Sequence, residues 1–142
     1  MPDKHIIIGI VIGALMFLTG VDIIPILLLV GASILIDIDH FFYYIFRFKS
    51  CNIFEMNRYF RSDCHLEDKK NPLPILIFHN LETLLILALI AIPFPIIWYV
   101  IIGIQIHLLI DLAVMPTQRY PPIIKLSLIA VLNSNKRRAN NL

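Results

Sequence analysis

The chain has 142 residues, 58% of them hydrophobic, a net charge of +2 and a mean hydropathy of +0.81. A water-soluble domain needs a polar face on most of its helices, and the long apolar runs of this sequence offer none. The small net charge, without aromatic residues interleaved among the basic ones, argues against a nucleic-acid partner, so the composition predicts a membrane protein with one domain.

The first apolar run, residues 5–20, is predicted to be a membrane span. Its Gly9 and Gly13 lie at i and i+4, a spacing that leaves a smooth helix face for the close approach of another helix. His5 stands at the head of the run and no small-residue cleavage pattern follows it. We therefore expect the run to stay in the protein and not to be removed as a signal peptide.

The second span is predicted over residues 23–46. A tight turn at residues 20–22 precedes it, and Pro25 falls in its first turn, where the missing N–H costs nothing. Its end, residues 41–46, is aromatic and typical of the headgroup level of a bilayer. The second span should therefore lead directly into the membrane interface.

Residues 47–71 form a polar loop, in which we expect a short interfacial helix near residues 53–60. A third span over residues 73–92 and a fourth over residues 96–115 follow, each about 20 residues long and so long enough to cross a bilayer. Pro93 and Pro95 separate these two spans.

The basic residues predict the orientation of this four-span chain. All twelve Lys and Arg residues precede the first span, lie in the loop between the second and third spans, or follow the fourth. The positive-inside rule places these segments and both termini in the cytoplasm. We therefore expect an all-α, polytopic inner-membrane protein: a single domain with a four-helix transmembrane bundle, a polar loop between helices 2 and 3, and a short interfacial C-terminal segment over residues 121–132, followed by a frayed end over residues 133–142.

Ionisable side chains interrupt the apolar spans, where an unpaired charge is costly. They form four clusters that this topology places in the cytoplasmic half of the bundle: His5; Asp37, Asp39 and His40; His79 and Glu82; His107 and Asp111. Spacings of i, i+3 or i, i+4 put both members of the last two clusters on one helix face. Asp37 and His40 share a face too, whereas Asp39 points elsewhere unless the helix unwinds there. Because imidazole and carboxylate groups from facing helices bind metal ions in helical bundles, the four clusters predict a metal site.

Each cluster also has an explanation without a metal ion. His5 alone fits an interfacial anchor, His107 with Asp111 fits a hydrogen-bonded pair, and Glu82 near an interface fits a solvated acid. The metal hypothesis therefore depends on the convergence of the clusters at one depth and not on any single pair.

The polar loop contains residues of a different kind. A solvated His65 is favoured over a zinc ligand, and Cys51 and Cys64 are expected to be reduced thiols if the loop is cytoplasmic. Arg58 and Arg61 suit a phosphate group and an anionic lipid equally well.

Together these motifs resemble the YdjM-type family of membrane-bound metal-dependent hydrolases. The resemblance rests on His5 followed by Gly9, on the block Asp37-Ile38-Asp39-His40, on a histidine near the start of the third span, and on His107 with Asp111. That family is grouped with the zinc-dependent phospholipase C and P1 nuclease superfamily, helical phosphoesterases whose ions are held by His and Asp. The resemblance implies a His-x-x-x-Asp metal element at positions 107–111, an early histidine at position 5, and a bridging acid at Asp37 or Asp39.

The chain departs from the family pattern at two places. Ile36 stands where the family usually has Pro, and residues 78–82 stand where it usually has Arg-Gly and Thr-His-Ser. The match is therefore stronger around His107 than around His79.

From the residues and the resemblance together we expect a metal-dependent hydrolase of phosphoesters or phosphodiesters, such as phospholipid head groups or lipid-linked phosphates, recessed from the cytoplasmic face. The expected metal ligands are His5, Asp37, Asp39, His40, His79, Glu82, His107 and Asp111. Three of them, Asp37, Asp39 and Glu82, are also the candidate catalytic residues. Zinc is favoured, as one to three ions, and manganese or iron also suits these ligands. A divalent-metal transporter and a non-catalytic membrane scaffold are the alternatives, and a homo-oligomer is compatible with each of them.

Overall fold

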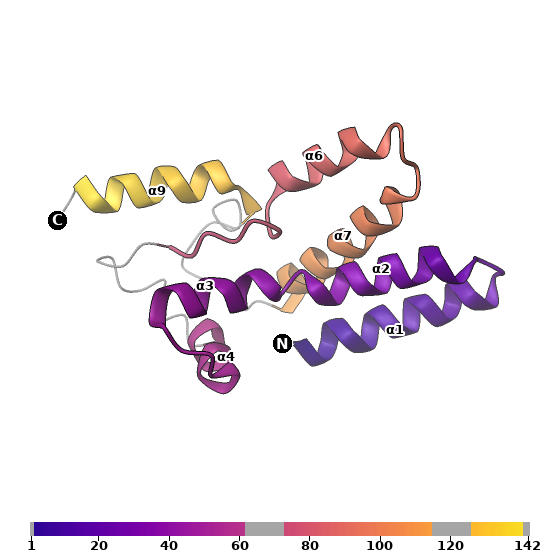
Figure 1. The fold of residues 1–142 in the computed structure, drawn as a ribbon, viewed down its shortest axis with the longest axis horizontal. Helices are drawn as coiled ribbons and strands as arrows, with labels where there is room; N and C mark the ends of the chain where they lie inside the picture. The colour runs from indigo at the N-terminus through magenta and orange to yellow at the C-terminus, as the bar shows by residue number, and fades with distance from the viewer. Residues whose placement is uncertain (1, 62–72, 115–125, 141–142) are drawn as a thin grey trace. The chain divides into compact units, whose positions relative to one another are not determined.

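The computed structural model describes residues 2–61, 73–114 and 126–140, whose regular structure is entirely α-helical (Figure 1). The helices are α1 (Pro2–Leu18), α2 (Ile23–Leu35), α3 (Ile38–Phe48), α4 (Ile53–Arg61), α6 (Leu81–Ala91), α7 (Ile97–Val114) and α9 (Leu128–Asn140). The chain divides into two compact units: unit 1 is Met1–Asp37 with Glu82–Thr117, and unit 2 is Ile38–Leu81 with Gln118–Leu142. The expectation of an all-helical protein is confirmed for these residues.

Helices α1 and α2 of unit 1 form a hairpin that turns at Gly20 (Figure 1). The φ of Gly20 is +83°, in the left-handed region that glycine adopts without strain. The N–H of Gly20 donates to the carbonyl of Phe17, and the N–H of Val21 donates to the carbonyl of Met16. These two bonds make a Schellman cap and confirm the tight turn expected there.

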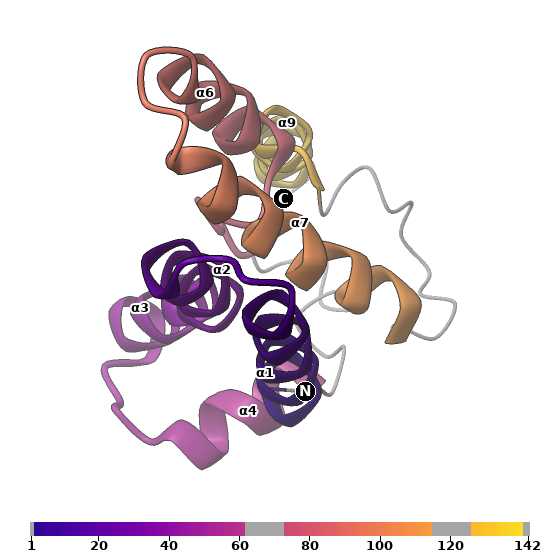
Figure 2. The same cartoon turned by 90° about the vertical axis from the view of Figure 1, so that its right-hand side faces the viewer.

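Helix α2 packs against both α1 and α7, and glycines make the contacts close (Figure 2). A Cβ at Gly9 would lie 2.7 Å from Oγ of Ser33, and one at Gly13 would lie 2.8 Å from a valine methyl group of α2. On the other side, a Cβ at Gly103 of α7 would clash with the backbone carbonyl of Leu29. The smooth face predicted from the glycines of α1 is confirmed, and α7 contributes a third glycine of the same kind.

A turn at residues 36–37 interrupts the second predicted span. Helix α2 ends at Leu35 and α3 begins at Ile38. The chain therefore unwinds beside its two acids, which is the alternative to a regular helix that the sequence left open. The boundary between the two units falls here, so Asp37 belongs to unit 1 and Asp39 to unit 2.

The stretch Ile23–Phe48, taken through that turn, is long and apolar enough to cross a membrane, the one such stretch among the described residues. Core helices of soluble proteins and signal sequences have the same property. Shorter apolar helices cover His5–Leu18, Leu81–Ala91 and Ile97–Ala113. The four spans stay a prediction.

Helix α6 begins at Leu81, well inside the third span predicted over residues 73–92. The side-chain amide of Asn80 donates to the carbonyls of Leu76 and Ile77 and so satisfies backbone groups that a longer helix would use. Asparagine is more favourable at a helix start than inside a helix for this reason. Residues 73–80 are therefore not helical, and the predicted start of the third span is wrong as a helix boundary.

In unit 2, α4 confirms the short helix expected near residues 53–60. Asn52 caps it, because its Oδ1 accepts hydrogen bonds from the N–H groups of Phe54 and Glu55. The hydroxyl of Tyr44 on α3 donates to the carboxylate of Glu55 at 3.4 Å, so α3 and α4 are joined by a polar as well as an aromatic contact.

Helix α9 forms the C-terminal part of unit 2. It continues to Asn140, so the expectation of a frayed end from residue 133 is wrong for residues 133–140. The side chain of Asn135 pairs with the backbone of Leu73: its Oδ1 accepts from the Leu73 N–H at 2.7 Å, and its Nδ2 donates to the Leu73 carbonyl at 3.1 Å. Two hydrogen bonds thus attach the segment before α6 to α9.

Candidate metal centre

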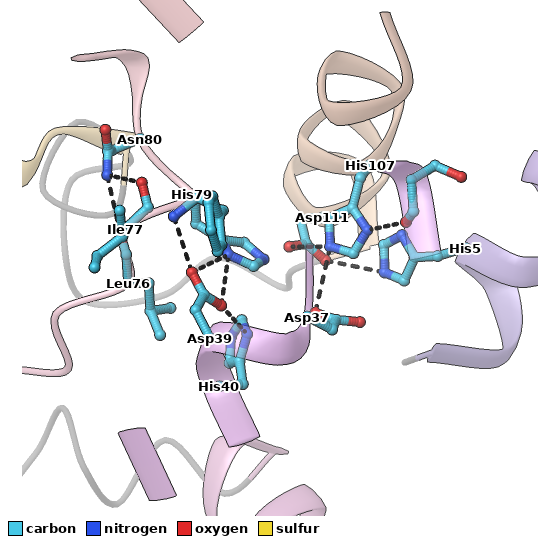
Figure 3. A network of polar contacts seen from close by, with 12 residues as sticks. His5, Asp37, Asp39, His40, Leu76, Ile77, His79, Asn80, His107 and Asp111 are labelled. Atoms are coloured by element: carbon cyan, nitrogen blue, oxygen red, sulfur yellow. Dashed lines mark hydrogen bonds and ion pairs between the residues drawn. The ribbon is translucent and has the colours of Figure 1, made fainter. Parts of the chain in front are cut away.

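His107 is the most buried member of a polar group in unit 1 (Figure 3). Its side chain is 0% exposed, and its Nδ1 lies 2.7 Å from the carbonyl oxygen of Ser33. Because a carbonyl only accepts, Nδ1 carries the hydrogen and the second nitrogen, Nε2, faces the rest of the group. Ser33 lies in the last turn of α2, where carbonyls lack the donors of a continuing helix. The end of α2 therefore determines which nitrogen of His107 can meet a cation.

Two carboxylates approach Nε2 of His107. Oδ1 of Asp37 lies 3.4 Å from it and Oδ2 of Asp111 lies 3.5 Å from it. Two carboxylates next to one buried ring nitrogen are stabilised by positive charge, which either a proton on His107 or a bound cation supplies. The arrangement therefore suits a cation.

His5 of α1 completes the group. Its Nε2 is 3.1 Å from Oδ1 of Asp111, and its ring stacks on that of His107 with centroids 3.9 Å apart and an interplanar angle of 16°. Positive charges on two stacked rings would repel each other. A bound ion would instead use both rings as neutral nitrogen ligands.

His5, His107 and Asp111 could hold a metal ion, because each offers one ligand atom and these atoms lie within 4.8 Å of one another. Nitrogen and oxygen atoms that bind one zinc ion lie about 2.0–2.2 Å from it. The distances between ligand atoms of one ion are therefore compatible with the 4.8 Å limit found here. The side chains of Asp111 and Asp37 are 22% and 37% exposed, whereas His5 is 3% exposed. A ligand from solution would therefore enter past the carboxylates.

Helix packing explains why these residues meet. His5, Gly9 and Gly13 follow one another at four-residue spacing and lie on one face of α1. The two glycines let that face approach α2 closely, which brings His5 to the same end of unit 1 as the C-terminal turns of α2 and α7. The site thus depends on the close contact between α1 and α2.

Unit 2 contains a second polar group, made of Asp39, His40 and His79 (Figure 3). Oδ1 of Asp39 lies 3.2 Å from Nδ1 of His40 and 3.1 Å from Nδ1 of His79. Asp39 and His79 are 6% and 5% exposed. These three residues were also expected to be ligands, and the structure brings them together.

His79 and Glu82 differ from the expectation. His79 lies in the turn before α6, and Glu82 is the second residue of that helix. The helix face that the two residues were predicted to share does not exist, because α6 starts only at Leu81. Among the described residues, the candidate metal-ligand groups do not include Glu82.

The residues of the polar loop are described only in part. Cys64 and His65 lie outside the described residues. Cys51 is a free, exposed thiol, and Arg58 is exposed on α4. The expected role of Arg58 stays a prediction.

Sequence reasoning missed the backbone groups that hold these side chains. The carbonyl of Ser33 and the N–H of Phe78 contact His107 and Asp39, and any residue type carries such groups. Only Asn80 gave a readable signal, because an asparagine directly before an apolar run is a typical helix start.

The fold and these two groups define a helical protein with one candidate membrane span and buried His/Asp groups that could hold metal ions. Comparison with protein-family models, with curated proteins and with solved structures finds no match to this chain.

Proposed function

We propose that this protein is a membrane-embedded, metal-dependent hydrolase of phosphoesters or phosphodiesters, with lipid head groups or lipid-linked phosphates as substrates. The observation that carries the proposal is the convergence of His5, His107 and Asp111 in unit 1, with Asp37 beside them. The proposal includes the resemblance of the same residues to the YdjM-type hydrolases.

The outward faces of the helices support a location in the membrane. Large apolar side chains are exposed on helices of unit 1, among them Ile7 at 61%, Leu18 at 80% and Leu85 at 64%. In water such faces would be costly, whereas lipid chains cover them without cost. We propose a multi-pass inner-membrane protein with both termini in the cytoplasm, as the distribution of the basic residues predicts.

The residues of the unit 1 group have distinct tasks in this proposal. A divalent ion, with zinc favoured over manganese or iron, supplies a more acidic bound water and positive charge for phosphate oxygens. His5, His107 and Asp111 hold the ion. The side chain of Asp37 is 37% exposed against 22% for Asp111, so Asp37 would be available to accept a proton or to help hold a second ion.

A divalent-metal transporter is the second candidate, and the turn at residues 36–37 favours it. Broken helices beside carboxylates are typical of ion sites in transporters. However, the unit 1 group lies near one end of α1 and α7: His5 is three residues from the start of α1, and Asp111 is three residues from the end of α7. Transport sites usually lie near the bilayer midplane, so we favour the hydrolase.

Metal content tests the site itself. Full-length protein purified in detergent should contain at least one tightly bound divalent ion by elemental analysis, and His107→Ala should lose it. Gln105→Ala is the matched control, because Gln105 is a polar, exposed residue of the same helix and should keep the wild-type content. If no metal co-purifies or can be bound, the hydrolase and the transporter are both wrong, and the scaffold alternative is favoured.

Activity separates the two metal-dependent functions. Wild-type protein in phospholipid vesicles should release phosphate or a head group, and the vesicles should take up no metal ions. The Asp37→Asn variant should not release either product. Uptake of zinc or manganese without release would favour the transporter. Unchanged release by Asp37→Asn would contradict the role assigned to Asp37.

A further inference from the structure

Asp39 is a buried carboxylate that lies beside the backbone N–H of Phe78 and the rings of His40 and His79 in unit 2 (Figure 3). Its Oδ2 accepts a hydrogen bond from the N–H of Phe78 at 3.0 Å and lies 3.1 Å from Nδ1 of His79. Its Oδ1 lies 3.2 Å from Nδ1 of His40. Both imidazoles therefore turn the same edge, the Nδ1 edge, toward one carboxylate.

This arrangement determines what the rings can bind. An imidazole that donates from Nδ1 has its lone pair on Nε2, at the opposite edge of the ring. The rings of His40 and His79 are also perpendicular neighbours, with centroids 4.4 Å apart. In metal sites, a carboxylate on the Nδ1 side of a ligating histidine is a common way to orient the ring and raise its basicity.

We propose that Asp39 is a positioning residue that orients His40 and His79 to bind a divalent metal ion through their Nε2 atoms, and that Asp39 is not itself a ligand. The inference rests on the proposed metal-dependent function but concerns the unit 2 group alone. It gives the two neighbouring acids different roles, with Asp37 in the unit 1 group and Asp39 as the orienting carboxylate.

The hydrogen bonds of Oδ2 argue against ligation through that oxygen, and Nδ1 of His79, 3.1 Å from both oxygens, argues against ligation through either. One oxygen already accepts from a backbone N–H, which cannot turn away without moving the turn that carries His79. An ion bound to Asp39 would meet the protonated edge of His79, so that ring would have to flip before it could share the ion. Ligation through Nε2 needs no such rearrangement.

Metal titration of the full-length protein in detergent tests the assignment. His79→Ala should bind one zinc ion fewer than the wild type. Asp39→Asn should keep the wild-type number at saturation, because an amide oxygen still accepts from Nδ1, but with zinc affinity about 10–100-fold weaker, as for other orienting partners of metal ligands. Asp22→Asn is the matched control, since Asp22 is exposed and its side chain makes no capping hydrogen bond, and it should bind as the wild type does.

Three results would overturn the proposal. Wild-type stoichiometry in His79→Ala would mean that the unit 2 group holds no ion. Loss of the same ion in Asp39→Asn would make Asp39 a ligand, and unchanged affinity in that variant would remove its positioning role. Circular dichroism should show wild-type helix content in each variant.

Nitrogen-15 NMR of histidine-labelled wild-type protein provides a measurement that does not depend on the folding of a variant. On addition of zinc, Nε2 of His79 should shift as a bound nitrogen while Nδ1 keeps its proton. Binding through Nδ1, or no shift, would contradict the proposal. Loss of an ion in His107→Ala reports on the unit 1 group separately, so the failure of one assignment can be told from the failure of the other.

Discussion

The two acids around His107 are not equivalent. Asp111 approaches the Nε2 atoms of both His5 and His107, at 3.1 Å and 3.5 Å, and Asp37 approaches that of His107 at 3.4 Å. Asp37 also has the more exposed side chain. Asp111 is therefore placed to bind an ion together with both rings, and Asp37 is the acid more accessible to solvent.

We accordingly expect Asp111→Asn to weaken zinc binding more than Asp37→Asn. Removal of a direct ligand should weaken zinc affinity by more than the roughly 10–100-fold that is typical for a residue outside the ligand set. Asp37→Asn should weaken zinc affinity by an amount within that range. Competition titration with a zinc-binding dye measures both affinities. Equal losses would mean that the two acids share the ion, and a larger loss in Asp37→Asn would reverse the assignment.

The His and Asp residues of the two polar groups could be predicted from the sequence, and the backbone atoms that hydrogen-bond to them could not. An imidazole or carboxylate in an apolar run is conspicuous because its burial must be compensated. The compensation at His107 comes from the carbonyl of Ser33, and at Asp39 from the N–H of Phe78. Backbone groups are the same in every residue, so only the fold reveals which of them is used.

At the scale of helices, close contacts depend on positions where no side chain fits. Gly103 of α7 faces the backbone of Leu29, and backbone atoms cannot move aside as a flexible side chain can. Gly31, in the middle of α2, has open space where a Cβ would lie. The same substitution should therefore have opposite effects at the two positions.

We expect Gly103→Ala to destabilise the protein by about 1–3 kcal/mol, the usual cost of overpacking. Gly31→Ala should stabilise it by roughly 0.5–1 kcal/mol, because alanine is the better helix former and meets nothing there. Chemical unfolding of the purified protein, followed by circular dichroism, gives both free energies. A neutral Gly103→Ala would show that α2 and α7 are not in close contact in the purified protein.

Helix ends were harder to predict than helix contacts. The glycine pair of α1 and the turn at Gly20 could be predicted because each depends on the local sequence. The start of α6 has a local signal in Asn80, but the attachment of Leu73 to Asn135, 62 residues further along the chain, has none. The turn after Leu35 has no proline or glycine to mark it, and apolar residues continue on both sides of the acids.

At the scale of the whole molecule, the number of membrane crossings is the feature on which the proposed function most depends. One described stretch, Ile23–Phe48, is long enough to cross alone. Helices α6 and α7 are joined by an exposed turn around Phe94, which is 60% exposed. The side of the membrane on which this turn lies distinguishes one crossing from four.

Single-cysteine labelling with a membrane-impermeant maleimide measures that side, in a background with Cys51→Ser and Cys64→Ser. With four spans, Val21→Cys and Phe94→Cys should react from outside spheroplasts, and Lys136→Cys should react only in inverted vesicles, because the basic segments stay in the cytoplasm. With a single crossing at Ile23–Phe48, Val21→Cys and Phe94→Cys should react on opposite sides. That result would exclude the four-span topology. The proposed metal site on the cytoplasmic side would then have to be abandoned.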